Sequence, residues 1–333
     1  MTFDDVRAQP NAVRALKQAL ANDRVASAYL FDGPTGIGKG RAALALATAL
    51  ACPAKPRVGC GKCDVCRRIA EGKHPDVRVI HPREEGDQNL QIEYIRAEVL
   101  PFTQYAPFEA AAAVMIFTDA DVSFPGNHAE SANAMLKTLE EPRANVHFIL
   151  TSSRPDRLLQ TIRSRCQRVR FQRLPPTTML QILEEHNVPV AEREAVTGLA
   201  DGRADVALAL AADGTGSKLL ELATRIDAVV ESGRAGPAIE LAESLAKRDD
   251  LPLALDSIVA FYRDVAATAL AMPASSLVFG RSAPAIQERA KTLSPERAAA
   301  RADAIRRAAE AIDRNANAEI VLDSLLLSLR AAT

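Results

Sequence analysis

The chain has 333 residues, 48% hydrophobic and 25% charged, which is typical of a soluble globular protein with two or three domains. Lys plus Arg number 41 against 42 for Asp plus Glu, and this balance excludes a global basic field for nucleic acid. No run approaches the roughly 18 apolar residues of a membrane span, and the N-terminus, MTFDDVRAQP, is too acidic for a signal peptide. We therefore expect a cytoplasmic protein whose five cysteines serve as metal ligands rather than in disulfides.

The first predicted elements are an amphipathic helix at 11–21 and then a strand, a glycine-rich loop and a second helix. The strand is the apolar run 29–31, and the second helix is the alanine- and leucine-rich segment 41–51. The loop between them, GPTGIGKG at 33–40, matches the phosphate-binding pattern G-x-x-x-x-G-K-[S/T] at seven of its eight positions.

Each position of this loop has a chemical reason. Gly33, Gly36 and Gly38 let backbone N–H groups surround phosphate oxygens at a helix N-terminus, and Lys39 reaches the outer phosphates. The eighth position should carry a hydroxyl for Mg²⁺, but the residue there is Gly40. The pattern therefore predicts a nucleotide loop that lacks one metal ligand.

The next segment, 52–72, breaks the alternation of strands and helices with Pro, Gly and four cysteines. These are Cys52, Cys60, Cys63 and Cys66. Four thiolates at C-x-x-C spacing suit a closed, tetrahedral, structural Zn²⁺ site, and the metal would hold together a segment with almost no apolar residues. A redox C-x-x-C is the alternative, but it does not account for four cysteines. His74 is the alternative for one of the ligands.

Strands and helices alternate through the rest of the first half of the chain. We predict strands at 76–80, 113–118, 146–150 and 167–171, a helix at 90–100 that ends at Pro101, and a helix at 127–141 that Pro142 stops. This alternation predicts βαβ units and a doubly wound parallel sheet.

The apolar run VMIFTDAD, which ends at Asp121, has the form of a Walker B strand. Asp119 falls where a carboxylate would orient the Mg²⁺ shell, but the next position, where a Glu would polarise the attacking water, is Ala120. Asp121 is the weaker candidate for that Glu because it lies two residues further on. The paired carboxylates Glu140 and Glu141 are better interpreted as a helix end than as an acid–base pair, since adjacent helix residues do not face one another.

Two groups of arginines leave alternatives open. Arg154, Arg157 and Arg163 precede Ser164-Arg165-Cys166; this cluster is either a solvated face or the setting of one arginine that enters a neighbour's phosphate site. The second group is interleaved with alanine near the C-terminus and lacks aromatic partners for base stacking, so we predict a solvated or interface face. It consists of Arg297, Arg301, Arg306, Arg307 and Arg314.

The strands stop after Leu174, and the double proline at 175–176 marks a boundary. We predict an α/β domain at 1–174 and a bundle of three short helices at 175–213. A larger all-helical domain is predicted at 214–333. The short helices are expected at 177–185, 191–200 and 204–211, and helix breaks are expected near 233, 252, 273–275, 280–284 and 294–295.

Several stretches together resemble one family, the AAA+ clamp-loader subunits of bacterial DNA polymerase III. They are AYLFDGPTGIGKG, the C-x7-C-x2-C-x2-C insert, NAMLKTLEEP, FILTSSRPDRLLQTIRSRC and NANAEIVLDSLLLSL. They occur in the family's order from end to end, and the LKTLEEP and SRC pair is highly specific. The resemblance implies a P-loop AAA+ α/β core with a zinc insert, a helical lid and an all-α C-terminal collar for oligomerisation.

The family contains gamma/tau subunits, which hydrolyse ATP, and a catalytically quiet stator. The departures favour the stator: Gly40 and Ala120 replace two catalytic groups, and Asp205 occupies the position of the lid's sensor 2 arginine. The resemblance therefore implies no ATPase activity in the chain itself, ATP or ADP at most bound, and Arg165 acting in trans as an arginine finger on a gamma/tau site. Ser152 and Ser153 fall at the sensor 1 position without a catalytic role.

The resemblance also implies partners. These are the gamma/tau and delta subunits, with the sliding clamp and primed DNA reached through the complex, as part of the DNA polymerase III holoenzyme. The alternatives are a divergent gamma-type ATPase and a zinc-dependent DNA-binding module.

Overall fold

The chain forms two compact units, Met1–Pro175 and Pro176–Thr333. The computed structural model describes residues 1–82, 90–124, 129–140, 143–212, 214–273, 277–279, 284–314 and 316–331. In this part of the chain, the helices are too short or too polar to traverse a lipid bilayer. The division into 1–174, 175–213 and 214–333 remains a prediction.

The first unit is built on a five-stranded parallel sheet with the order β2-β3-β4-β1-β5. The strands are β1 (Ala28–Asp32), β2 (Val77–Ile80), β3 (Ala113–Phe117), β4 (Val146–Ser152) and β5 (Gln167–Arg170). Every residue of β1 and β3 is buried, as expected for strands covered on both faces. The predicted α/β core with a parallel sheet is confirmed.

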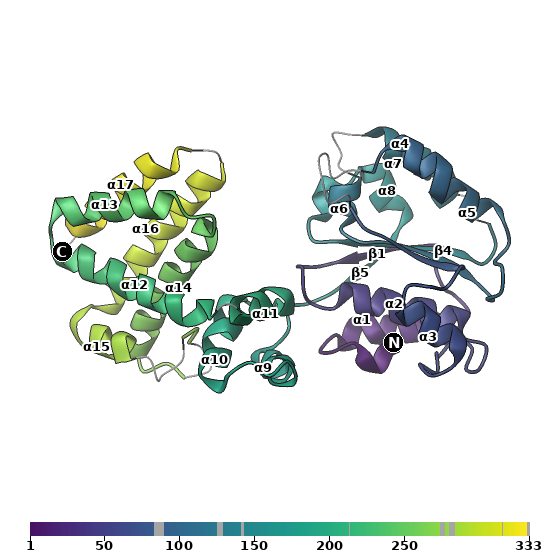
Figure 1. The fold of residues 1–333 in the computed structure, drawn as a ribbon, viewed down its shortest axis with the longest axis horizontal. Helices are drawn as coiled ribbons and strands as arrows, with labels where there is room; N and C mark the ends of the chain where they lie inside the picture. The colour runs from purple at the N-terminus through teal and green to yellow at the C-terminus, as the bar shows by residue number, and fades with distance from the viewer. Residues whose placement is uncertain are drawn as a thin grey trace. The chain divides into compact units, whose positions relative to one another are not determined.

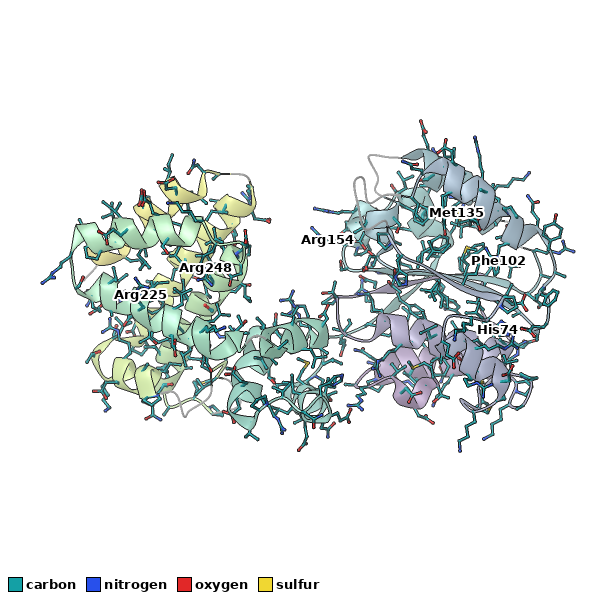
Figure 2. The ribbon with its side chains drawn as sticks, in the orientation of Figure 1. His74, Phe102, Met135, Arg154, Arg225 and Arg248 are labelled. Carbon is teal, nitrogen blue, oxygen red and sulfur yellow. The ribbon has the colours of Figure 1, made fainter. Side chains whose placement is uncertain are left out.

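Helices cover both faces of this sheet, with α1, α2 and α3 on one face and α4 to α8 on the other (Figure 1). On the second face, Met135 of α7 is fully buried and Phe102 of α5 packs against the same core (Figure 2). The helices of the unit are α1 (Pro10–Ala21), α2 (Lys39–Ala51), α3 (Asp64–Ala70), α4 (Ile92–Tyr94), η2 (Ile95–Val99), α5 (Leu100–Gln104), α6 (Ala120–Ser123), α7 (Ala129–Glu140) and α8 (Gln160–Arg165), with short 3₁₀ turns η1 (Phe3–Asp5) and η3 (Pro155–Arg157).

The helical segment before β3 differs from the prediction that it ends at Pro101. A π-helical turn, η2, lies between α4 and α5, and α5 continues to Gln104. Pro101 has no N–H and lies in the first turn of α5, where a missing intrahelical donor is tolerated. In the next predicted helix, Glu141 and Pro142 lie outside the described residues.

The register of the strands sets where the candidate site lies. Asp32 at the end of β1 pairs with Ser152 at the end of β4 and with Arg170 of β5. The phosphate loop therefore leaves the sheet at the same edge as the segment after β4. In open α/β sheets, ligands bind at this carboxyl edge.

The second unit is helical throughout its described residues. Its helices are α9 (Pro176–Glu185), α10 (Val190–Leu199), α11 (Ala204–Ala212), α12 (Thr215–Glu231), α13 (Ala235–Ala246), α14 (Leu251–Ala269), α15 (Pro284–Thr292), α16 (Pro295–Asp313) and α17 (Ala318–Ala331). Pro252 and Pro295 each lie in the first turn of a helix, and Ser294 caps α16 by accepting the Arg297 N–H at 3.3 Å. Among the predicted breaks, residues 274–276 and 280–283 lie outside the described residues.

One arginine of the C-terminal group contradicts its prediction. Arg297, Arg306, Arg307 and Arg314 are exposed, but Arg301 is only 3% exposed. Its guanidinium lies among two carboxylates, Asp227 and Glu231, and over the ring of Tyr262. Charge patterning along α16 cannot reveal this, because the partners come from α12 and α14.

Candidate nucleotide, arginine and metal sites

The phosphate loop has the backbone geometry that its glycines predict. Gly38, just before α2, has φ 97° and ψ 14°, in the left-handed region. A Cβ at Gly33 would lie 2.6 Å from the carbonyl oxygen of Phe171, so the loop passes too close to the end of β5 for any other residue. The loop thus forms at the N-terminus of a helix, where backbone N–H groups favour an anion.

Lys39 folds back on its own loop. Its Nζ donates to the carbonyl oxygen of Gly33 at 2.5 Å and also to that of Pro34, and the residue is buried. A phosphate would therefore replace two carbonyl partners of this ammonium group.

Gln9 holds the loop in a way that sequence reasoning did not find. Its side-chain amide donates to the carbonyl oxygens of Ile37, at 3.2 Å, and Gln172, at 2.6 Å. Its carbonyl oxygen accepts the Gln172 N–H at 2.9 Å. A buried glutamine near the chain's start thus joins the loop to the segment after β5, and a 163-residue separation leaves no local sequence signal.

Gly40 lies in the first turn of α2, and a Cβ built there would have no atom within 4 Å outside its chain neighbours and the adjacent backbone of its own helix. Crowding therefore does not explain the missing hydroxyl.

The turn after β3 lacks a free carboxylate in the position of a general base. Ala120 is fully buried, and Asp119 adopts the left-handed conformation (φ 44°, ψ 54°) at the start of α6. Asp121 is buried and accepts hydrogen bonds from the N–H and the hydroxyl of Ser153, at 3.1 and 3.3 Å. Its carboxylate fixes the end of β4. Ser152 is likewise engaged, since its Oγ accepts the Arg154 N–H at 3.1 Å.

Arg165 is the last residue of α8, and its side chain curls back along that helix. Nη1 donates to the carbonyl oxygen of Thr161 at 2.8 Å, and Nη2 pairs with the carboxylate of Glu140 at the end of α7. The side chain keeps 29% of its surface exposed, and its Nε is buried without a hydrogen-bond partner. The guanidinium is thus held by two helices while part of it faces solvent.

The other arginines of this cluster differ from Arg165. Arg154 and Arg157 are exposed, and Arg163 pairs with the exposed Asp156 at 2.8 Å. Asp205, the residue at the sensor 2 position, belongs to the second unit, where it is exposed in the first turn of α11.

The four cysteines of the insert converge. Their Sγ atoms all lie within 4.8 Å of one another, and the Cys52–Cys63 and Cys60–Cys66 pairs are 3.8 and 3.7 Å apart. A tetrahedral Zn²⁺ with Zn–S bonds of about 2.3 Å has S–S edges of roughly 3.8 Å. The side chains therefore have the spacing of a Zn²⁺ ligand set.

The surroundings favour the charged thiolate at Cys60 but not at Cys66. Hydrogen bonds from the N–H groups of Lys62 and Cys63 lower the pKa of Cys60 to about 6, whereas burial raises the pKa of Cys66 to about 12. Cys52 Sγ accepts the N–H groups of Lys55 and Cys60, at 3.3 and 3.4 Å. Such backbone donors are suited to thiolates that bind a metal. The four cysteines could hold a metal ion; His74 belongs to a separate network with Asp76 and Glu109.

The comparisons with known proteins agree on one family. A family model described as DNA polymerase III, delta subunit, matches residues 8–175, just over half of the chain. The DNA polymerase III subunit delta' of Bacillus subtilis is 36% identical over 180 residues, 54% of this chain and 52% of that protein. The DNA polymerase III subunit tau of Salmonella typhimurium is 38% identical over 166 residues, 50% of this chain and 24% of that protein.

A solved structure of a gamma subunit-related protein from Thermotoga maritima covers 96% of this chain and 98% of its own, with 17% identity and a TM-score of 0.41. The chain spans about half, or less, of the length of the curated relatives named above. Because the family model covers half of the chain, the chain belongs to the DNA polymerase III delta-subunit family, in which its relatives include the delta-prime subunits of the clamp loader.

Proposed function

We propose that the chain is the delta-prime stator of a DNA polymerase III clamp loader. In this function it hydrolyses no ATP itself. It assembles in the cytoplasm with gamma/tau and delta subunits that place the sliding clamp on primed DNA. The relatives named delta-prime and tau support membership of such a complex.

The observation that carries the proposal is a phosphate loop without a metal-binding hydroxyl beside a turn that offers no general base. The loop keeps its glycines and Lys39, but Gly40 carries no hydroxyl for Mg²⁺. Ala120 offers no general base, and Asp121 is engaged with Ser153. Phosphoryl transfer relies on the metal and on an oriented nucleophile, so a nucleotide here would be bound without being hydrolysed.

The working residue of the chain is then Arg165, acting as an arginine finger on a neighbouring gamma/tau site. Its position at the end of α8, partly exposed, allows the side chain to extend toward a partner. When the Arg165 side chain extends, its guanidinium leaves the carboxylate of Glu140 and pairs with phosphate oxygens instead. One anionic partner thus replaces another. In the same proposal, zinc bound by Cys52, Cys60, Cys63 and Cys66 has a structural role.

The test uses the purified chain and the reconstituted loader. The chain alone should show ATP turnover at background level, and omitting it from the loader should lower clamp loading. A divergent gamma-type ATPase would instead turn over ATP alone and lose that activity with Lys39→Ala. Turnover by the isolated chain that Lys39→Ala abolishes would contradict the proposal.

A titration of the isolated chain with labelled ATP distinguishes a phosphate loop that binds nucleotide without Mg²⁺ from one that binds the Mg²⁺ complex. We expect weak binding that is the same with and without Mg²⁺, because the first turn of α2 provides no hydroxyl for the metal. Gly40→Thr is the matched variant, since its Cβ enters open space. It should bind ATP more tightly with Mg²⁺ than without. Strong Mg²⁺ dependence in the wild type would contradict our account of Gly40.

A further inference from the structure

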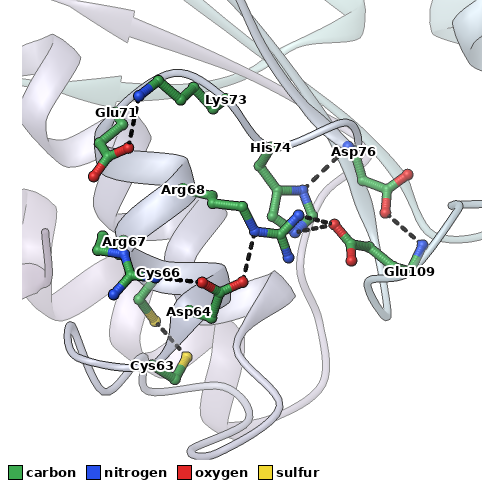
Figure 3. Close-up of polar contacts among 10 residues, drawn as sticks. All are labelled: Cys63, Asp64, Cys66, Arg67, Arg68, Glu71, Lys73, His74, Asp76 and Glu109. Atoms are coloured by element: carbon green, nitrogen blue, oxygen red, sulfur yellow. Dashed lines mark hydrogen bonds and ion pairs between the residues drawn. The ribbon is translucent and has the colours of Figure 1, made fainter.

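A chain of polar contacts runs from α3, which contains Cys66 and directly follows Cys63, to the loop before β3 (Figure 3). Cys63 and Cys66 lie at the start of α3, and Asp64 between them pairs with Arg67 at 2.5 Å and with Arg68 at 2.8 Å. The metal-binding segment and the arginines of α3 are therefore one structural unit.

Arg68 connects this structural unit to the loop before β3. While its Nε donates to Asp64, its Nη1 pairs with the carboxylate of Glu109 at 2.5 Å, 41 residues along the chain. The hydrogen bond from Arg68 lowers the pKa of Glu109, so the pair is ionised at neutral pH. Arg67, one residue earlier, pairs with Asp64 alone among the described residues and is the more exposed of the two.

His74 completes the environment of Glu109. Its Nδ1 accepts the Asp76 N–H at 3.1 Å, which places the proton of the neutral ring on Nε2. Nε2 faces Glu109 at 3.4 Å, and burial lowers the pKa of the imidazole. Arg68 is therefore the cation that neutralises Glu109 at neutral pH.

The same loop is anchored through its backbone. The buried carboxylate of Asp76, just before β2, accepts the N–H groups of Phe108 at 2.6 Å, Glu109 at 2.9 Å and Ala110 at 2.8 Å. These three amides report directly on the order of the loop, because each loses its partner when the loop moves away from Asp76.

The anchored loop carries aromatic side chains that face water. Tyr105 is 70% exposed and Phe108 is 84% exposed, in a chain with only 4% aromatic residues. The backbone of Phe108 is fixed by Asp76 while its ring is held outside. The anchored backbone therefore holds the two aromatic side chains, Tyr105 and Phe108, in a fixed and exposed position.

The end of the contact chain at α3 depends on the metal. The helix has seven residues, of which only Cys66 and Ile69 are buried, and an isolated helix of this length does not form in water. Apart from a metal, α3 is held by the packing of Cys66 and Ile69 and by the Arg68–Glu109 pair, so we expect the metal to contribute much of what fixes the helix.

We propose that metal binding at the four cysteines controls the order of the loop at 105–112, with Arg68 as the link. When the metal is bound, α3 holds Arg68 on Glu109, and the loop stays on Asp76 with Tyr105 and Phe108 presented outward. When the metal is lost, the guanidinium leaves Glu109 and the loop is held by Asp76 alone.

Hydrogen exchange of the full chain, resolved at residues 108–110, tests this coupling. Chelating the zinc should raise exchange of these three amides about two- to fivefold, the size expected for the loss of one partly exposed ion pair. Arg68→Met should show the faster exchange with zinc still bound, and chelation should then add little. Arg67→Met is the matched control, because it removes an arginine of α3 that does not reach Glu109, and it should behave like the wild type.

Two outcomes would overturn the proposal. One is unchanged protection at 108–110 when zinc removal has already exposed the amides of α3. The other is Arg68→Met with zinc bound and protection equal to that of Arg67→Met. This second comparison needs no chelation, so it decides the question even if the metal-free chain unfolds further.

Discussion

In a reconstituted clamp loader, Arg165→Ala should lower the turnover of the ATP site that the proposed function assigns to this arginine by about 10³–10⁵-fold. The physical reason is that a guanidinium stabilises charge on the transferring phosphoryl group only in the transition state. The total ATPase activity of the loader should fall by the fraction that this one site contributes. Clamp loading should fall as well. Steady-state ATPase assays with the other sites intact measure this effect.

The loss should be kinetic, because Arg165 contributes little to its own unit. Its contacts are one carbonyl oxygen and the half-exposed Glu140, and such pairs contribute at most about 1 kcal/mol to stability. The variant should therefore enter the complex normally in size-exclusion chromatography. Arg157→Ala, which removes an exposed arginine of the same cluster, is the control and should keep full activity. Wild-type turnover in Arg165→Ala would refute the finger assignment.

The substitution Glu140→Gln tests whether the ion pair with Glu140 restrains Arg165. The amide keeps the shape of the carboxylate but loses its charge, so Arg165 is freer to leave α7. Turnover at low ATP should then equal or exceed that of the wild type, and the change should vanish in an Arg165→Ala background. A loss of turnover as large as that of Arg165→Ala would instead make Glu140 a required orienting group.

The parts of the fold that sequence could predict are those with local patterns. Runs such as AVMIF and the loop GPTGIGKG predict their structure within a few residues, and the spacing of the cysteines alone predicts the cluster that they form. The helix through Pro101 was predicted wrongly because a π turn before a proline leaves no pattern in side-chain type.

What sequence could not predict are partners far apart in the chain. Glu140 lies 25 residues from Arg165, and the pair was hidden because each was interpreted within its own motif. Glu109 and Arg68 are 41 residues apart, and Gln9 has no motif at all. Tertiary packing, which no local pattern encodes, brings these groups together. Asp121 was considered as a substitute base, and its engagement with Ser153 likewise depends on β3 lying beside β4.

The largest expected effect on stability comes from the second unit, where Arg301→Met should lower the free energy of unfolding by about 3–5 kcal/mol. Arg301 donates to Asp227 at 3.3 Å and to Glu231 at 2.8 Å. Without it, the buried Asp227 and the partly exposed Glu231, both of α12, share Arg289 as their cation. Urea denaturation of the full chain, with exchange of α16 amides to locate the loss, measures the change.

Acidity provides an independent check on the cause. Burial raises the pKa of Asp227 even with both arginines present, and removing Arg301 should raise it further. A carboxyl with a raised pKa in the folded state binds its proton there before it does in the unfolded chain, whose pKa is about 3.9. The folded state therefore gains stability relative to the unfolded chain as the pH falls through the raised pKa toward that value. The deficit of Arg301→Met should accordingly shrink between neutral pH and about pH 5.

A matched substitution on the same helix tests whether burial of the charges causes the loss of stability in Arg301→Met. Arg306 also pairs with an aspartate, Asp303 at 2.9 Å, but both side chains are more than half exposed. Arg306→Met should change stability by less than about 0.5 kcal/mol, because solvent screens the charge that is left behind. Equal losses in the two variants, or a deficit in Arg301→Met that does not change with pH, would show that lost packing and not an unpaired buried carboxylate destabilises the unit.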